Sequence, residues 1–150
     1  MAILSASAAQ SPTRKTRKDF QRLAQLRANE ARSLAKADKE MGAYYLAGFA
    51  VECALKACIA KKTRRHDFPA DAKYANEVYT HNLERLLKVA QLDVHLDRDM
   101  RAKPQLAIHW GVVKEWTIDS RYEVSGLNGK DMVAAVNTSD GVLQWIKLYW

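Results

Sequence analysis

The segment that decides the fold reads YYLAGFAVECALKACIA and covers residues 44–60. It holds two charged residues, Glu52 and Lys56, and no proline. Its apolar side chains would lie on nearly every side of a helix, and such a helix is buried among other helices. The sequence therefore predicts a central helix that begins after Asp38 and runs to about Lys62.

An amphipathic helix is predicted before this segment, over residues 16–37. Its apolar residues recur at steps of three and four, and charged residues fill most of the other positions. The apolar positions are Phe20, Leu23, Ala24, Ala31, Leu34 and Ala35. This spacing is typical of a helix that turns one face toward a core.

Further helices are predicted after the central one. One covers residues 81–90, with Thr80 as its N-cap. Another covers about residues 97–116, where Pro104 either begins a helix or kinks one already formed. The inward residues of the first are Leu83, Leu86 and Leu87.

The last helix is predicted to start at Asn128, which can cap it, with Asp131 in its first turn. Gly141 lies inside this helix and indicates flexibility or close packing there. The predicted inward stripe is Met132, Val136, Leu143 and Ile146.

Length and composition agree with one helical domain. The chain has 150 residues, three prolines and six glycines, so little interrupts long helices. We expect an all-α, up-and-down bundle of four to five helices over residues 16–150, preceded by a disordered N-terminal tail at residues 1–15. Residues 64–79 mix charge with Pro69 and are predicted to be a connection.

The start of the chain lacks the basic segment and long apolar run of a secretory signal, and no run of ~18 apolar residues could span a membrane. We therefore expect a cytoplasmic protein with no membrane contact. Cys53 and Cys58 are five residues apart, which on one helix points them to different faces. Both are predicted to be reduced, buried thiols.

Positive charge is concentrated at the start of the chain. Residues 1–39 hold nine Lys/Arg and three Asp/Glu, which accounts for most of the net charge of +7. Such an asymmetry suits a polyanion such as RNA, or an acidic protein surface. It also suits an ordinary solvated helix face.

Glu52 and Lys56 stand four residues apart in the apolar central helix, with the acid first. That spacing predicts an ion pair, because an unpaired buried charge is costly. The pair is either a structural ion pair or a group that faces a ligand.

Three segments together resemble the HEPN family of helical domains. They are AYY at residues 43–45 followed by AVECALKA at 50–57, THNLERLL at 80–87, and the aromatic-to-Arg-Tyr stretch at 116–122. The similarity covers roughly residues 20–148. It implies an all-α bundle that is commonly a homodimer. Members include toxin–antitoxin proteins, RNA-cutting enzymes and non-catalytic modules that bind nucleotides or RNA.

The ribonuclease members of that family carry an arginine and a histidine separated by four to six intervening residues. None of the four histidines in this chain has an arginine at that spacing. The nearest approximation is Arg101 with His109, which are weak candidates for catalysis by a metal-independent ribonuclease. The alternative is a surface arginine and a packed histidine.

The resemblance and the residue chemistry lead to two hypotheses of function. The first is a non-catalytic or degenerate HEPN module that binds nucleotide or RNA, with Lys56, His81, Arg121 and Tyr122 in its groove. An arginine fork can take a phosphate and an adjacent aromatic ring can stack on a base. The alternatives are that His81 is a helix-start residue bonded to neighbouring backbone, which is the more common case, and that the Arg-Tyr pair fixes a loop. The second is a protein-interaction partner of a nucleotidyltransferase-type protein.

Other kinds of site find no support in the sequence. It contains no phosphate-cradling glycine loop, no zinc-ligand spacing and no carboxylate cluster, so we expect no metal and no cofactor. The tryptophans at helical positions are predicted to be core residues, with Trp145 or Trp150 available to a dimer interface.

Overall fold

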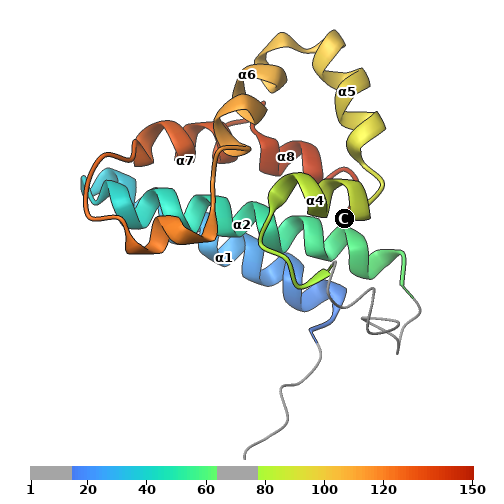
Figure 1. Cartoon of the computed structure of the whole chain (residues 1–150), viewed down its shortest axis with the longest axis horizontal. Coiled ribbons are helices and arrows are strands. Elements are labelled where there is room, and N and C mark those ends of the chain that lie inside the picture. Colours follow the sequence, from blue (N-terminus) through green and yellow to red (C-terminus); the bar gives the residue numbers. More distant parts are fainter. Residues whose placement is uncertain (1–14, 64–77) are drawn as a thin grey trace, which may run out of the picture.

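The computed structural model describes residues 15–63 and 78–150, and in those residues every regular element is a helix (Figure 1). The all-α prediction is confirmed. In chain order the elements are α1 (Arg17–Lys36), α2 (Glu40–Lys61), α4 (Leu83–Val89), α5 (Asp93–Ala102), α6 (Pro104–Val113), the 3-10 helix η1 (Ile118–Tyr122), α7 (Gly129–Asn137) and α8 (Val142–Ile146). Most of the predicted tail at residues 1–15, and of the connection at 64–79, lies outside the described residues.

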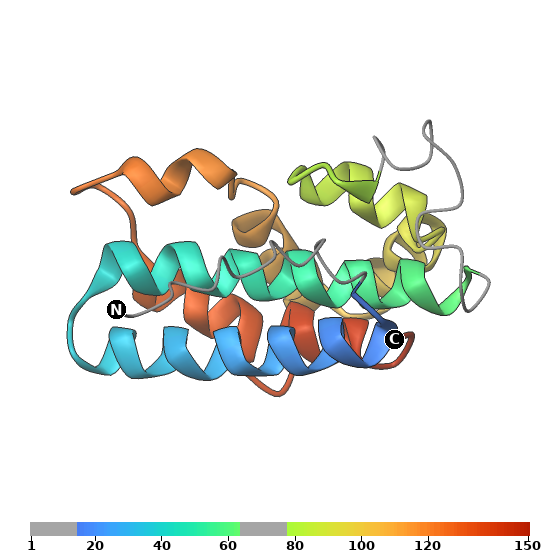
Figure 2. The same ribbon diagram turned by 90° about the horizontal axis from the view of Figure 1, so that it is seen from below.

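Helices α1 and α2 form an antiparallel hairpin (Figure 2). Thr16 begins α1 with a capping box, because its hydroxyl accepts from the Asp19 amide at 3.2 Å and the Asp19 carboxylate accepts from the Thr16 amide at 2.8 Å. The buried residues of α1 are all alanines: Ala24, Ala28, Ala31 and Ala35. Small side chains let the two helix backbones approach closely.

Helix α2 is the central element, as predicted. It packs against α1, α4, α7, α8 and η1, and every residue from 50 to 59 is buried. Its length and composition would also fit a membrane span, but 72% of its most apolar window is buried inside the bundle, as in the core helix of a globular domain.

The helix after residue 80 starts two residues later than predicted. Asn82, and not Thr80, is its N-cap, since the Asn82 side chain accepts from the Arg85 amide at 2.9 Å. The Thr80 hydroxyl instead accepts from the Asn82 amide at 3.1 Å, which fixes the turn before the cap. The predicted inward residues Leu83, Leu86 and Leu87 are all buried.

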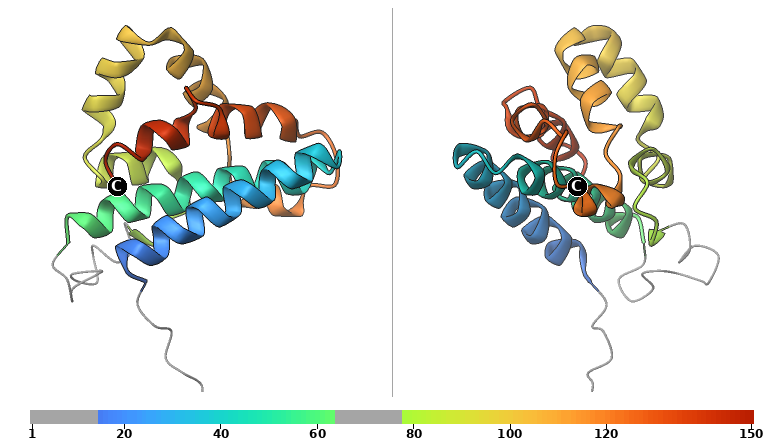
Figure 3. Two further views of the ribbon diagram at one scale, coloured as in Figure 1. Left: turned by 180° about the vertical axis from the view of Figure 1, so that it is seen from behind. Right: turned by 60° about the vertical axis from the view of Figure 1, so that its left-hand side comes forward.

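The predicted helix over residues 97–116 is two helices, α5 and α6, and α5 begins already at Asp93. Pro104 is the first residue of α6. Lys103 between the helices has φ −129° and ψ 87°, because a residue that precedes proline is pushed out of the helical region. The two helices form a hairpin that stands away from the α1–α2 layer (Figures 1 and 3).

The last predicted helix is also divided, into α7 and α8. Asn128 caps α7 as predicted, accepting from the Asp131 amide at 3.0 Å. The break is at residues 138–141, where a Cβ on Gly141 would lie 2.6 Å from the carbonyl oxygen of Val136. The four predicted inward residues are buried, so the pattern identified the correct face across the break.

Asp99 links α5 to α8. Its Oδ2 accepts from the Trp145 indole Nε1 at 2.8 Å, and its Oδ1 accepts from Arg98 Nε at 3.0 Å. These hydrogen bonds, from Arg98 first and then Trp145, hold the pKa of the Asp99 carboxyl below its ordinary value of 3.8. The folded state therefore favours the ionised form.

The Asp99 contact should make stability depend on pH in the acid range. A lowered pKa in the folded state means that its contribution is complete above pH ~4 and is lost as the pH falls below that value. We expect Asp99→Asn to be less stable than the wild type at pH 7, with the difference shrinking between pH 4 and 2 in urea titrations. A constant difference across that range would contradict this linkage.

Both cysteines are free and buried, as predicted. Burial raises the pKa of the Cys53 thiol to about 12 and that of Cys58 to about 11, so both thiols are protonated at neutral pH. Trp110, Trp116 and Trp145 are core residues, whereas Trp150 is partly exposed.

Candidate functional site

Three side chains meet at the C-terminal half of α2. The Glu52 carboxylate, 2% exposed, lies between Lys56 Nζ at 3.2 Å from Oε2 and His81 Nδ1 at 2.8 Å from Oε1. Lys56 is one helical turn after Glu52, and His81 comes from the segment before α4. The predicted Glu52–Lys56 pair is therefore present, and His81 joins it from 29 residues away.

This cluster has the geometry of a structural ion pair. Each Glu52 oxygen has a partner, and the Lys56 side chain is only 10% exposed and donates inward. A buried lysine that is already paired is poorly placed to take a phosphate. His81, with 47% of its side chain exposed, is the one member that offers substantial surface.

Arg121 and Tyr122 lie on η1, which packs against α2. The Arg121 guanidinium carbon sits 4.8 Å from the centre of the Tyr122 ring, and Tyr122 is 69% exposed. Figure 2 shows η1 along the first half of α2 and α4 along its second half. Within residues 15–63 and 78–150, no hydrogen bond or ion pair joins Arg121 to the Glu52 cluster.

Arg101 and His109 lie on different helices, α5 and α6, on either side of the break at Lys103. Arg101 is exposed and lines a depression together with Val94 and Arg98. The His109 ring Nε2 is 3.3 Å from the Gln105 side-chain nitrogen. No hydrogen bond joins Arg101 to His109 in the described part of the chain.

A basic surface forms where α1 begins and α2 ends. It consists of five exposed residues, which we call the basic end: Arg17, Lys18, Arg22, Lys61 and Lys62. Burial dominates the raised pKa of the Cys58 thiol, and the charges of Lys61, Lys62 and Arg17 each act to lower it. Charges from the start of α1 and the end of α2 therefore act on the same buried thiol.

Two contacts hold the basic end in place. Arg17 donates to the backbone carbonyl of Trp150, and Lys62 donates to the carbonyl of Ala90. The single carboxylate in the first turn of α1, Asp19, is engaged in the capping box. The sequence pattern located the charge on the first helix but missed the contribution of the α2 end, which depends on the antiparallel pairing.

A metal site has no basis in the described residues, where no group of three His, Cys, Asp or Glu side chains is arranged to hold an ion. The chain matches no family model, no curated protein and no solved structure.

Proposed function

We propose that this chain is a non-catalytic, HEPN-like module that binds RNA through the basic end. The observation that carries the proposal is that the antiparallel hairpin brings the start of α1, with exposed Arg17, Lys18 and Arg22, to the same end of the molecule as the end of α2, with exposed Lys61 and Lys62. Five cations at the junction of two helices attract a phosphate backbone and release its counterions on binding. Guanidinium groups can in addition take a phosphate in two parallel hydrogen bonds.

The basic end suits phosphates better than the Arg-Tyr pair of η1. Arg121 is flanked by exposed Asp119 and Glu123, so η1 and its C-cap carry a net negative formal charge. Tyr122 remains available for stacking on a base because its ring is largely exposed. In this proposal Arg121 and Tyr122 add a secondary contact, while His81 links the start of α4 to Glu52 on α2 and Lys56 pairs with Glu52 within α2.

Catalysis is not part of the proposal, because Arg101 and His109 lie on separate helices and the family's arginine–histidine spacing is missing. A nucleotidyltransferase-type protein with an acidic surface is the competing partner for the basic end. A homodimer is compatible with either.

The decisive measurement is the salt dependence of RNA binding. A labelled single-stranded RNA of mixed sequence is titrated with the full chain at several KCl concentrations, with chelator present, and followed by fluorescence anisotropy. We expect Lys18→Gln with Lys61→Gln to lower the slope of log K against log[KCl] by about 1.4, since each lost phosphate contact contributes about 0.7 for single strands. Both lysines are exposed and make no hydrogen bond in the described structure, so the fold should be unaffected.

The matched control removes two exposed charges elsewhere, with Arg101→Gln and Lys114→Gln. The slope should then change by much less than in the basic-end variant. If the slope falls equally in the two double variants, the effect depends only on net charge, and the basic end is not a defined binding surface. If RNA does not bind and the same surface instead captures an acidic protein, the result favours the nucleotidyltransferase-type protein as the partner. RNA cleavage abolished by His109→Ala would overturn the non-catalytic assignment.

A further inference from the structure

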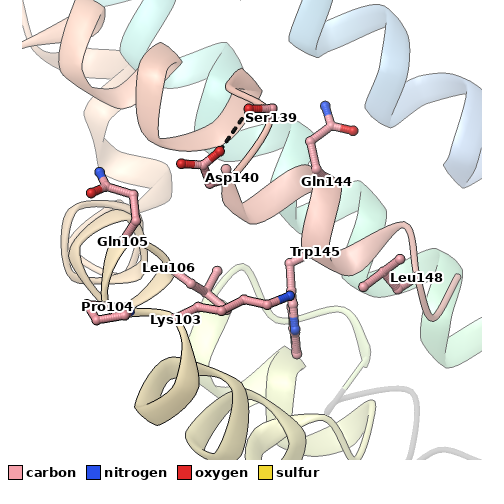
Figure 4. Close-up of a pocket in the computed structure, with 10 residues that line it drawn as sticks. Lys103, Pro104, Gln105, Leu106, Ser139, Asp140, Gln144, Trp145 and Leu148 are labelled. Atoms are coloured by element: carbon pink, nitrogen blue, oxygen red, sulfur yellow. Dashed lines mark hydrogen bonds between the residues drawn. The ribbon is translucent and has the colours of Figure 1, made fainter.

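A pocket of about 620 Å³ lies between the beginning of α6 and the turn that joins α7 to α8 (Figure 4). Its volume falls within the range of small-molecule sites. The pocket exists because both predicted long helices are broken nearby, one before Pro104 and the other at Gly141. It is separate from the Glu52 cluster and from the basic end.

The apolar walls of the pocket face each other across the two helices. Pro104 and Leu106 come from α6, and Trp145 and Leu148 come from α8 and the residues after it. The Trp145 ring is fixed, because its Nε1 donates to Asp99 and its ring packs at 5.0 Å on Tyr149. Leu148 is 70% exposed, which leaves an apolar wall that no described residue covers.

The polar rim mixes donors and acceptors without a net charge, since Lys103 on one side is balanced by Asp140 on the other. The Ser139 hydroxyl donates to Asp140 Oδ1 at 2.8 Å, which leaves Oδ2 able to accept. In the described structure neither the Gln144 carboxamide nor the Lys103 ammonium makes a hydrogen bond. Gln105 also lines the pocket, with its carboxamide nitrogen 3.3 Å from the His109 ring (Figure 4).

We infer that this pocket binds a planar, uncharged heteroaromatic ring of the nucleobase type. A lining with several apolar residues, including the small exposed part of the fixed Trp145 side chain (5% exposed), suits a flat ring of this size. Carboxamide and carboxylate groups at its mouth match a ring edge that carries both donors and acceptors, and a rim with no net charge does not favour an ionic ligand. The preference for a nucleobase over other such rings rests on the proposed RNA binding, whereas the neutral ring follows from the pocket itself.

The same ring chemistry occurs in a free nucleoside and in an unpaired base of an RNA strand. A nucleoside carries no phosphate, so its binding does not depend on the basic end. Failure of the pocket and failure of the RNA proposal can therefore be told apart. Basic-end variants should lose RNA affinity yet respond to nucleosides as the wild type does.

The test is a titration of the ¹⁵N-labelled full chain with adenosine, cytidine, guanosine and uridine, each to its solubility limit or about 10 mM, followed by NMR. We expect the Trp145 indole N–H and the Gln144 side-chain amide signals to shift for at least one nucleoside. Gln144→Leu should weaken that binding by about threefold to tenfold, the effect of one neutral hydrogen bond. Ser139→Trp, at an exposed position on the rim, should block it.

Gln21→Leu is the matched control, because Gln21 is also a half-buried glutamine but lies on α1 and does not line the pocket. The Gln21→Leu variant should bind the nucleosides as tightly as the wild type does. A short RNA that shifts the same signals identifies a base within a strand as the ligand, and shifts with nucleosides alone identify a free nucleoside. The inference is overturned if no nucleoside moves the Trp145 signal, or if Gln144→Leu and Ser139→Trp bind as tightly as the wild type.

Discussion

Gly48→Ala is expected to lower the free energy of unfolding by about 2–4 kcal/mol, although alanine is the better helix former. A Cβ at position 48 would lie 2.2–2.4 Å from the Cδ1, Cγ and Nε1 atoms of the Trp116 ring. The Trp116 ring has little room to move away from this added Cβ. It is 2% exposed, and its Nε1 donates to the Tyr45 carbonyl at 3.2 Å. Urea unfolding followed by circular dichroism measures the loss.

Gly111→Ala provides the matched control in another helix. Nothing lies within 4 Å of a Cβ at Gly111. The same substitution should there stabilise the protein by up to about 1 kcal/mol, because alanine restricts the unfolded chain and favours the helix. The two glycine variants should therefore move in opposite directions.

A double-mutant cycle connects the loss at Gly48 to Trp116. In a Trp116→Leu background the ring is gone, and the cost of Gly48→Ala should fall by at least about 1 kcal/mol. If the cost stays the same in that background, the clash with Trp116 is not its cause.

Glu52→Ala should destabilise the protein by about 3–5 kcal/mol, because it leaves the Lys56 ammonium buried without its carboxylate. Glu52 is 2% exposed and the Lys56 side chain 10%. The same change also removes the partner of His81 and so loosens the start of α4. Thermal and urea unfolding of the full chain give the measurement.

Two further variants separate these contributions. His81→Ala should cost much less than Glu52→Ala, since His81 is half-exposed and its loss leaves the Lys56–Glu52 pair intact. Glu52→Leu with Lys56→Met removes both charges together and should recover most of the stability. A double variant as unstable as Glu52→Ala would show that packing, and not the unpaired charge, decides the effect.

The sequence predicted what depends on local periodicity. The buried stripe of α7 and α8, the Asn128 cap and the central place of α2 all follow from residue spacing within one segment. The N-cap of α4 is Asn82 and not the predicted Thr80; both residue types are good N-caps and they lie two positions apart. Local sequence does not decide between them. The second helix break, at Gly141, depends on the close approach of the Val136 carbonyl.

The candidate sites likewise differ in whether they depend on local spacing or on contacts between distant segments. The Glu52–Lys56 pair was predictable because i,i+4 residues are neighbours on a helix. The contact with His81, the contribution of Lys61 and Lys62 to the basic end, and the pocket between Pro104 and Trp145 depend on segments that meet only in three dimensions. None of these could be located from spacing along the chain.

The alanine face of α1 affects the entropy of folding. Ala24, Ala28, Ala31 and Ala35 have no side-chain rotamers to lose when they are buried, unlike the leucines of α4. Ordering α1 against α2 therefore costs mainly backbone freedom. Leu23 and Leu34 pack at the edge of this contact, whereas exposed Lys18 and Arg22 make no hydrogen bond in the described structure and keep the conformational freedom to follow a partner of irregular shape.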